Sequence, residues 1–401
     1  MANGGDPGLQ YPAALPPMIG HYLVRKKYVA AGISVIDALC SVVAGLGPAG
    51  AAPGEAGLRS ILISQCAHLG DLIMTLPALH WIRRNRPELR IGLVVGSWAK
   101  PMLPGIAELY DACYFADHFM LDRSDRSRKE KLARHRSSWK AAAAAIKQDQ
   151  YDAAVECYPF LPNSIALLYA CGIPVRVGFT GGGFGPLLTH KVTWKHASRP
   201  FRDYPRDLLR VLFGDGSLDR PFEPYHPAPA VTLASPKPPY VVVHTGTGNP
   251  TREWPEERWT ELVGDLASRP TTVVLAGAGS RERDRAGRIA NTVGGGVVNL
   301  CDKLTWDEFT ALVAGAAHVV CLDSSPSHLA AAFRIPATVI MPTTNDPRQF
   351  GPANDQARVL SFPTPCAPCF RSMGCDHMAC IRRVTVVEAR QAIFGRLEPV
   401  G

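Results

Sequence analysis

The sequence predicts an α/β protein made of two doubly wound domains in tandem. Short apolar runs of strand length alternate with helical patterns from Leu58 onward, a proline-rich stretch at 221–239 interrupts them, and the alternation then restarts. Short buried strands separated by helices indicate a parallel sheet covered on both faces. A length of 401 residues accommodates two such domains and an appendage.

The first 57 residues differ from the rest of the chain. Arg25, Lys26 and Lys27 precede a stretch, 28–52, whose only charged residue is Asp37. Four structures compete for it: an interfacial helix with its basic flank on anionic headgroups, a helix packed on the globular body, a transmembrane span and a signal peptide. The interfacial helix is favoured, because Asp37 and the glycines weaken a span of barely sufficient length.

The first domain is expected to begin with a strand at 61–65. A helical pattern follows over 72–84 with Pro77 inside it, so we expect either a kink or a helix that begins nearer Thr75. Further strands are predicted at 91–95, 113–115, 152–157 and 175–178.

The second domain follows the proline-rich stretch, which we interpret as a linker. Strands are predicted at 240–244, 271–276, 297–300, 318–323 and 337–341, and Thr305–Glu308 is a capping box that opens a helix. Ligands of doubly wound folds lie at the carboxyl ends of the strands, so a cleft between the domains is expected.

Composition narrows the class of partner. The net charge is +8, from 43 Lys and Arg against 35 Asp and Glu, which indicates an anionic partner: nucleic acid, a phosphorylated substrate or a membrane surface. An apolar share of 46% excludes a wholly disordered chain. The odd number of cysteines, 11, argues against a secreted disulfide scaffold and fits a reducing cytoplasm.

The first candidate for chemistry is Asp71, in the run His68-Leu69-Gly70-Asp71 directly after the first strand. Gly70 permits a tight turn, and a carboxylate at the mouth of the sheet can act as a general base. The same residue can serve only as a helix cap, and spacing alone favours the cap.

The second candidate is the loop 244–255, after the first strand of the second domain. Gly246 and Gly248 leave backbone N–H groups accessible, Thr247 offers a hydroxyl and Arg252 a positive fork, a set suited to a diphosphate. It is neither a Walker A loop nor a complete G-x-G-x-x-G fingerprint. A generic turn explains it nearly as well.

The third candidate is Asp323-Ser324-Ser325-Pro326-Ser327-His328, which leads from a strand into a helix. N–H groups at the helix start can bind a phosphate, and the proline suits the first turn. A catalytic Ser-His pair is discounted, because no G-x-S-x-G elbow surrounds the serines. A well-capped helix with a packed histidine is the plain alternative.

The sequence leaves the roles of two further clusters undecided, one of cysteines and one of basic residues. Cys366, Cys369, Cys375 and Cys380 can be zinc ligands or structural cysteines, and the second spacing does not match a familiar zinc ribbon. The stretch 123–140 carries eight Lys and Arg, which can form a solvated helix face or bind phosphate. Nucleic acid is disfavoured, because no aromatic interleaving or recognised motif accompanies the basic residues.

Three blocks occur in order along the chain: 61–79, with the Leu-Gly-Asp turn; 252–259, with Arg-x-Trp-Pro; and 323–332, followed by 341–347. In this combination the sequence resembles glycosyltransferase family 9, the bacterial heptosyltransferases that build the lipopolysaccharide core. The segment 151–189 and the cysteine-rich end resemble the same family more weakly than these three blocks do. The resemblance implies a GT-B fold, with an N-terminal acceptor domain and a C-terminal nucleotide-sugar domain facing each other.

The resemblance also implies roles for residues that match the family's motifs. Asp71 matches the catalytic carboxylate, and the donor site corresponds to phosphate-binding Thr247, Ser324, Ser325 and His328, ribose-binding Glu282, sugar-contacting Asp323 and nucleobase-lining Leu304. Arg252 stands where the family usually has lysine, and the two serines stand where it often has Asp, Thr or Gly.

The implied domains are an extension with a possible membrane-associated helix (1–57), the acceptor domain (58–220), the linker (221–239), the nucleotide-sugar domain (240–380) and a C-terminal helix or tail (381–401). The implied reaction is inverting glycosyl transfer without a metal or other cofactor. Asp71 deprotonates an acceptor hydroxyl, while Arg252, Thr247 and the N–H groups at Ser324 and Ser325 stabilise the departing diphosphate.

The implied partners are a nucleotide sugar, expected to be an ADP-sugar, and a lipid-linked or phosphorylated cell-envelope glycan, with no nucleic acid. The expected location is the cytoplasm, peripheral to the inner face of the cytoplasmic membrane. Two rivals remain: a non-catalytic nucleotide-sugar-binding protein, and a nucleotide-sugar epimerase on a related two-domain architecture.

Overall fold

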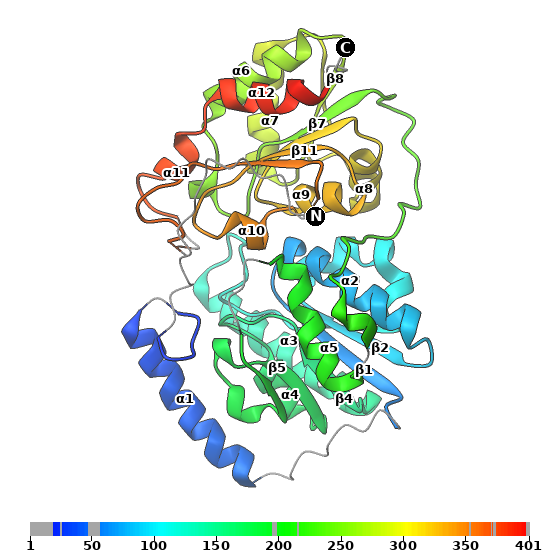
Figure 1. Cartoon of the computed structure of the whole chain (residues 1–401), viewed down its shortest axis with the longest axis vertical. Helices are drawn as coiled ribbons and strands as arrows, with labels where there is room; N and C mark the ends of the chain where they lie inside the picture. The colour runs from blue at the N-terminus through cyan, green and yellow to red at the C-terminus, as the bar shows by residue number, and fades with distance from the viewer. Residues whose placement is uncertain are drawn as a thin grey trace. The chain divides into compact units, whose positions relative to one another are not determined.

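A computed structural model of the chain describes residues 19–24, 26–46, 57–194, 199–214, 216–352, 354–369, 371 and 374–397 (Figure 1). The chain divides into two compact units. The N-terminal unit contains the described residues up to 194 and those within Phe201–Glu223, and the C-terminal unit contains residues 199–200 and the described residues from Pro224 onward. The proline-rich stretch 221–239, in which one unit gives way to the other, contains no helix or strand.

The N-terminal unit is built on a parallel six-stranded sheet in the order β3-β2-β1-β4-β5-β6. Its strands are β1 (Ser60–Gln65), β2 (Arg90–Val95), β3 (Ala112–Phe115), β4 (Ala153–Glu156), β5 (Val175–Phe179) and β6 (His190–Val192). β1 lies at the centre and is buried along its whole length. A central parallel strand is covered on both faces, which explains why its apolar residues 61–63 do not alternate with polar ones.

Helices cover both faces of this sheet. They are α1 (Lys27–Leu46), α2 (Leu69–Asn85), α3 (Arg128–Asp149), α4 (Ile165–Ala170) and α5 (Tyr204–Phe213), with short 3₁₀ helices η1 (Ser97–Met102), η2 (Pro104–Leu109), η3 (Thr180–Gly182), η4 (Gly185–Leu187), η5 (Phe201–Asp203) and η6 (Gly216–Asp219). One core joins Leu62 of β1 to Ile146 of α3 and Leu168 of α4. α2 and α5 contact the sheet and each other.

The C-terminal unit repeats this plan in the order β12-β11-β10-β7-β8-β9, again with all strands parallel. Its strands are β7 (Tyr240–His244), β8 (Thr272–Leu275), β9 (Val297–Asn299), β10 (His318–Leu322), β11 (Ala337–Ile340) and β12 (Ala357–Leu360). Numbered within each unit, both sheets have the order 3-2-1-4-5-6 of a doubly wound fold.

Helices again lie on the sheet of the C-terminal unit. They are α6 (Glu256–Ala267), α7 (Ser280–Val293), α8 (Trp306–Ala314), α9 (Ser325–Ala332), α10 (Pro347–Phe350), α11 (Ala379–Arg382) and α12 (Val386–Leu397), with one short 3₁₀ helix η7 (Pro250–Arg252). The main core packs Trp259 of α6, Ile289 of α7 and Ile393 of α12 against Val241 and Val243 of β7. Alternate residues of β7 therefore face this core, as strand geometry requires.

All ten predicted strands are confirmed, and the departures, one helix start and two further strands, have physical causes. α2 begins at Leu69, so the predicted start near Thr75 is wrong, although Pro77 does lie inside the helix. Pro77 removes one intrahelical N–H donor, but capping by Asp71 and ten buried residues hold the first turns in place. β6 and β12 were not predicted, because short, partly exposed edge strands carry no continuous apolar run.

α1 packs on the N-terminal unit instead of standing apart from it. Ala30 and Ile33 are buried together with Tyr22, and Asp37 is only 8% exposed. Among the described residues, 27–45 form the one helical segment long and apolar enough to cross a membrane, with a mean hydropathy of 1.8. Arg25 and residues 47–52 of the predicted segment lie outside the described residues.

Candidate functional site

Most of the predicted site residues follow the strands that flank the topological switch point of each sheet, where strand order reverses and doubly wound folds bind ligands. In the N-terminal unit this point lies between β1 and β4, and Asp71 follows β1. In the C-terminal unit it lies between β7 and β10. The loop from Thr245 to Glu253 follows β7, and the segment Asp323–His328 follows β10.

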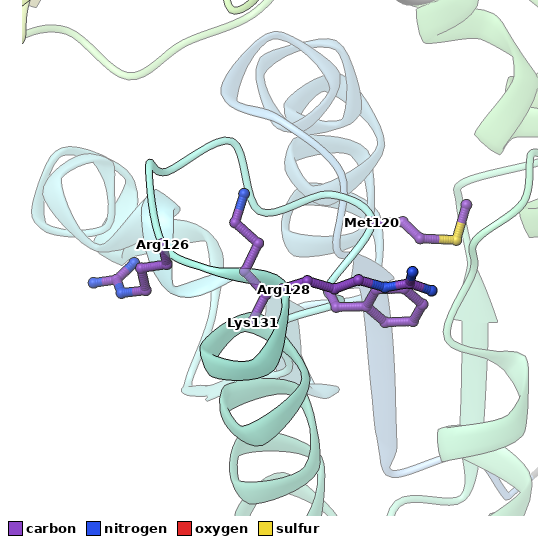
Figure 2. Close-up of a pocket in the computed structure, with 5 residues that line it drawn as sticks. Met120, Arg126, Arg128 and Lys131 are labelled. Carbon is purple, nitrogen blue, oxygen red and sulfur yellow. The ribbon is translucent and has the colours of Figure 1, made fainter.

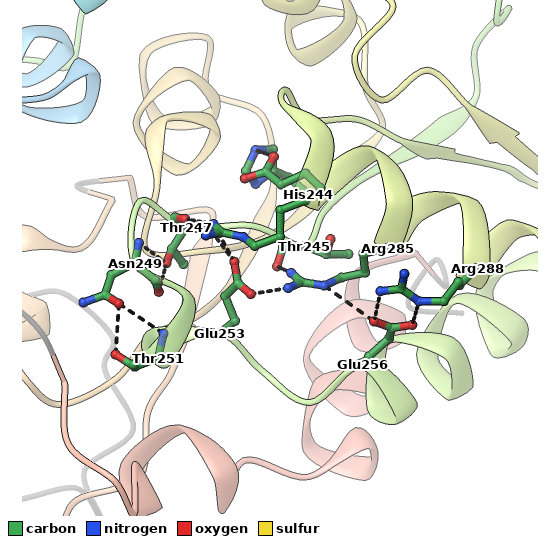
Figure 3. A network of polar contacts seen from close by, with 11 residues as sticks. His244, Thr245, Thr247, Asn249, Thr251, Glu253, Glu256, Arg285 and Arg288 are labelled. Carbon is green, nitrogen blue, oxygen red and sulfur yellow. Dashed lines mark hydrogen bonds and ion pairs between the residues drawn. The ribbon is translucent and has the colours of Figure 1, made fainter. Parts of the chain in front are cut away.

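The loop after β7 is fixed by its own hydrogen bonds (Figure 3). The Thr247 hydroxyl donates to the Asn249 carbonyl at 2.7 Å and accepts from the Asn249 N–H at 3.1 Å. The Asn249 side chain then accepts from the N–H of Thr251 at 3.1 Å and so caps η7. Thr247 therefore shapes this loop, in addition to the phosphate-binding role predicted for it.

The buried carboxylate of Glu253 holds the same loop in place through two arginines of α7. The sequence did not predict this role. Glu253 accepts from the guanidinium of Arg285, and Arg281 approaches its other oxygen at 3.0 Å. The two arginines also donate to loop carbonyls, Arg285 to Thr245 at 2.8 Å and Arg281 to Thr247 at 2.7 Å. The spacing of the arginines, four residues apart on α7, was the available signal, because such residues share one helix face.

Arg252 and Asp323 form the central ion pair of the candidate site. The Arg252 Nη2 lies 2.6 Å from the Asp323 Oδ2, and the two side chains are only 12% and 14% exposed. The Nε atom of Arg252 is buried and has no hydrogen-bond partner within the described part of the chain. A buried guanidinium donor without a partner is costly, and an anionic ligand would satisfy it.

The ion pair brings this cation to the start of α9. Ser324 is the N-cap residue, Ser325 is the first helical residue, and Pro326 has no N–H to donate. The Ser324 hydroxyl donates to the Leu322 carbonyl at 3.2 Å instead of capping the helix. His328 lies one turn into α9 and is buried. The helix dipole and Arg252 thus favour negative charge at the same edge of the sheet.

Glu282 lies in the first turn of α7 against two glycines. A Cβ atom added to Gly246 would lie 1.8 Å from the Glu282 Oε1, and one added to Gly277 would lie 2.4 Å from the Oε2. The Oε2 atom also accepts from the Ala278 N–H at 3.1 Å and lies 3.4 Å from the His244 Nε2. Only glycine at these two positions leaves room for the carboxylate.

Leu304 belongs to the loop between β9 and α8 and is partly buried. In the same loop, the Asp302 N–H donates to the Gly277 carbonyl at 2.8 Å, which links this loop to the Glu282 cradle. The structure therefore brings the predicted donor-site residues to one end of the C-terminal sheet. Asp71 belongs to the other unit.

Asp71 is partly exposed in the first turn of α2. Its Oδ2 atom accepts from the His68 N–H at 3.0 Å, so the carboxylate does cap the helix, as one interpretation of the sequence expected. Arg123 and Asp71 both interact electrostatically with Tyr158, which follows β4. Burial, with Arg123 as the second cause, lowers the pKa of His68 to about 3, so that side chain is neutral near Asp71.

Glu156, at the end of β4, is a second group that the sequence analysis missed. It is fully buried and accepts from the N–H groups of Ser164 at 3.0 Å and Tyr158 at 3.1 Å. Burial raises its pKa to about 7. Glu156 therefore fixes the turn that carries Tyr158, and its charge depends on pH near neutrality.

The basic stretch 123–140 has both structural and solvent-facing members. Arg134 pairs with buried Asp117 and donates to the Ser97 hydroxyl at 2.6 Å, so it holds the polypeptide chain in place. Phe119, Met120, Arg126, Arg128 and Lys131 instead line an open hollow of about 570 Å³ at the start of α3 (Figure 2). Three cations around an open hollow suit an anionic ligand.

The four cysteines of 366–380 all carry free thiols, and Cys366 is exposed while Cys369 and Cys380 are buried. Burial raises the pKa of Cys380, and the nearby Cys369 and Cys375 raise it further. Within the described ranges, no group of three or more His, Cys, Asp or Glu side chains is arranged to hold a metal ion.

Sequence comparison identifies a family. The profile of glycosyltransferase family 9 (heptosyltransferase) matches residues 139–377. Lipopolysaccharide heptosyltransferase 1 of Pseudomonas aeruginosa is 28% identical over 78% of this chain and 86% of its own length. Lipopolysaccharide heptosyltransferase 1 of Escherichia coli K12 is 26% identical over 73% of this chain and 90% of its own length.

Structural comparison identifies the fold. The E. coli heptosyltransferase WaaC with ADP superposes with a TM-score of 0.66 at 21% identity, over 84% of this chain and 99% of that one. A glycosyl transferase of family 9 from Veillonella parvula superposes with a TM-score of 0.65 at 14% identity, over 86% of this chain and 99% of that one. The predicted two-domain α/β fold of the GT-B type is thereby confirmed.

Proposed function

The chain belongs to glycosyltransferase family 9 and is a glycosyltransferase, and from this premise we propose that it moves a heptose or a similar sugar from an ADP-linked donor to a lipopolysaccharide-type glycan. The observation that carries the proposal is the buried Arg252–Asp323 ion pair beside the start of α9, with an Arg252 Nε atom that no described residue satisfies. A diphosphate bound there would receive the missing hydrogen bond.

The donor diphosphate is the leaving group in this proposal. Negative charge grows on it as the bond to the anomeric carbon breaks, and fixed donors lower the barrier most when they contact that charge. Arg252 supplies a cation, and the N–H groups at Ser324 and Ser325 supply the positive end of the α9 dipole. We propose that these groups do the work for which other glycosyltransferases use a divalent cation.

The nucleoside is proposed to bind beside the diphosphate. The Glu282 carboxylate, fixed between Gly246 and Gly277, can accept hydrogen bonds from both ribose hydroxyls. Leu304 can cover one face of the base, and Asp323 can contact the sugar while it orients Arg252. His328 is assigned to the phosphates, because it lies one turn into α9.

Asp71 is proposed as the general base. The acceptor hydroxyl gives its proton to the Asp71 carboxylate, its oxygen bonds to the anomeric carbon from the face opposite the diphosphate, and the nucleoside diphosphate departs. The product therefore has inverted anomeric configuration. The hydrogen bond from the His68 N–H fixes the orientation of the carboxylate, and neutral His68 adds no competing positive charge.

The acceptor is proposed to be a lipid-linked, phosphorylated glycan. The hollow lined by Arg126, Arg128 and Lys131 lies in the same unit as Asp71 and can bind its anionic groups. A lipid-linked acceptor, together with heptosyltransferase relatives, supports a cytoplasmic enzyme that works at the inner face of the cytoplasmic membrane.

Acceptor-dependent release of ADP tests this function. The purified protein is incubated with ADP-heptose and a lipid A precursor that carries inner-core sugars, with and without EDTA, and the product is analysed by mass spectrometry and NMR. We expect ADP release only with acceptor, an inverted linkage and no loss with EDTA. Donor binding without turnover would contradict the proposal, and so would a change in the donor sugar without acceptor.

A further inference from the structure

The outer face of α1 is a surface that the transfer reaction does not use. Tyr28, Val35, Leu39 and Val42 lie on it and are 68%, 62%, 64% and 64% exposed. Their spacing of seven, four and three residues places them in one stripe along the helix. We call this stripe the α1 outer face.

The opposite face of α1 is fixed to the N-terminal unit. The Tyr22 hydroxyl donates to the Asp37 Oδ2 at 3.0 Å, and the Phe184 N–H donates to the Oδ1 at 2.6 Å. Ile33 packs so closely that a Cβ atom added to Gly183 would lie 2.6 Å from its Cγ2. The helix therefore cannot rotate freely, and its apolar outer face is held toward solvent.

The charges beside the outer face indicate what covers it. Lys26 directly precedes α1 and Lys27 is its first residue, and the Lys26 ammonium lies 5.4 Å from the centre of the Tyr28 ring. From Tyr28 to Leu46 the only charged residue is Asp37, on the opposite face. Apolar residues with flanking lysines and an aromatic ring are typical of a helix at the interface of an anionic bilayer.

We propose that the α1 outer face docks into the headgroup layer of an anionic membrane, with the helix axis parallel to the surface. The bonds of Asp37 argue for this orientation over a span. A spanning α1 would lose both hydrogen bonds and carry a carboxylate into the hydrocarbon near its middle. The proposal concerns a lipid surface and does not depend on which sugar is transferred.

Flotation with lipid vesicles tests the proposal. The full chain is mixed with vesicles of phosphatidylglycerol and phosphatidylcholine, or of phosphatidylcholine alone, that contain neither donor nor acceptor. We expect binding to the anionic vesicles and release by carbonate. The double variant Leu39→Ser, Val42→Ser should bind at least about tenfold more weakly, because two exposed side chains lose apolar burial in the lipid.

Two further variants separate the contributions. Lys26→Gln with Lys27→Gln should weaken binding to anionic vesicles by about fivefold for each lysine. Val387→Ser on α12 is the matched control, because it removes another valine that is 54% exposed, and it should change nothing. Thermal unfolding should be unaffected in all variants, because every changed side chain is exposed.

Three results would overturn the proposal. The wild-type chain could fail to bind anionic vesicles, or it could resist carbonate and so span the bilayer. The outer face could also hold a second copy of the chain, in which case Leu39→Ser, Val42→Ser would convert a dimer to a monomer without changing vesicle binding. Transfer to a water-soluble acceptor fragment, measured separately, reports on the enzymatic function alone.

Discussion

Replacing Arg252 by alanine tests the most specific feature of the proposed donor site. The side chain is 12% exposed, lies 2.6 Å from Asp323 and carries a buried Nε atom that has no hydrogen-bond partner among the residues that the structure describes. If it stabilises the departing diphosphate, its loss should lower kcat by about 10²–10³, the usual effect of removing one preorganised donor, or about 3–4 kcal/mol. The KM for the donor should rise less than kcat falls.

The same substitution also leaves the Asp323 carboxylate unpaired. Breaking a buried ion pair costs about 3–5 kcal/mol of folding stability, and the residual exposure of 12–14% favours the lower end of that range. Thermal unfolding must therefore be measured alongside ADP release. Arg252→Lys separates the two effects, because it keeps the charge beside Asp323 but loses the planar fork of donors.

Arg390→Ala is the matched control for Arg252→Ala. Arg390 pairs with Glu261 and Asp265 on the surface of the same unit, is 36% exposed and lies on α12, outside the proposed site. An exposed pair contributes at most about 1 kcal/mol, so this variant should keep full activity. If folded Arg252→Ala retained transfer within about twofold of the wild type, the leaving-group role would be refuted.

Three further predictions follow from other contacts. Gly246→Ala should raise the donor KM at least about tenfold in steady-state assays. The new Cβ atom would lie 1.8 Å from the present position of the Glu282 Oε1 and would therefore push the carboxylate away. An unchanged KM would contradict the ribose role of Glu282. Burial raises the pKa of Glu156 from 4.5 to about 7, so the folded chain keeps a proton that the unfolded chain has lost. Its contribution to stability is complete below about pH 4.5 and is lost as the pH rises to about 7. The unfolding temperature of the wild type, relative to Glu156→Gln, should therefore fall over that range by the equivalent of about 3 kcal/mol, and a parallel pH dependence would contradict the assignment. Asp37→Ala should loosen α1 by removing the acceptor of the Tyr22 hydroxyl, seen as faster trypsin cleavage after Lys26 and Lys27; unchanged cleavage would show that other contacts suffice.

The strands that the sequence predicted best are those at the centres of the two sheets. β1 and β7 are buried along their whole length, so their apolar runs 61–63 and 240–243 do not alternate with polar residues and lie shortly before the site loops. β6 and β12 are edge strands that include His190 and Arg358, and a half-exposed edge needs no apolar run. The start of α2 was misjudged, because the effect of Pro77 is local, whereas the burial that outweighs it is tertiary.

The sequence predicted where in the fold the site residues lie better than it predicted the hydrogen bonds and ion pairs between them. The order of the motifs indicated that Arg252 and Asp323 contact one ligand. Their ion pair could not be predicted, because the two residues are far apart in sequence and meet only in the folded chain. The dual use of Asp71 was visible as two competing interpretations, and the structure shows the helix cap. The buried network of Glu253 and Arg285 left no signal beyond the spacing of α7 arginines, because one sequence does not reveal burial.

The central claim is that this chain transfers a sugar with Asp71 as the base. Asp71→Asn tests it most directly, because the amide oxygen can still accept from the His68 N–H and so preserve the cap of α2. Acceptor-dependent ADP release should fall by about 10²–10⁴ in this variant, while its affinity for the ADP-sugar, measured by calorimetry, stays unchanged. Near-normal transfer by folded Asp71→Asn would contradict the account.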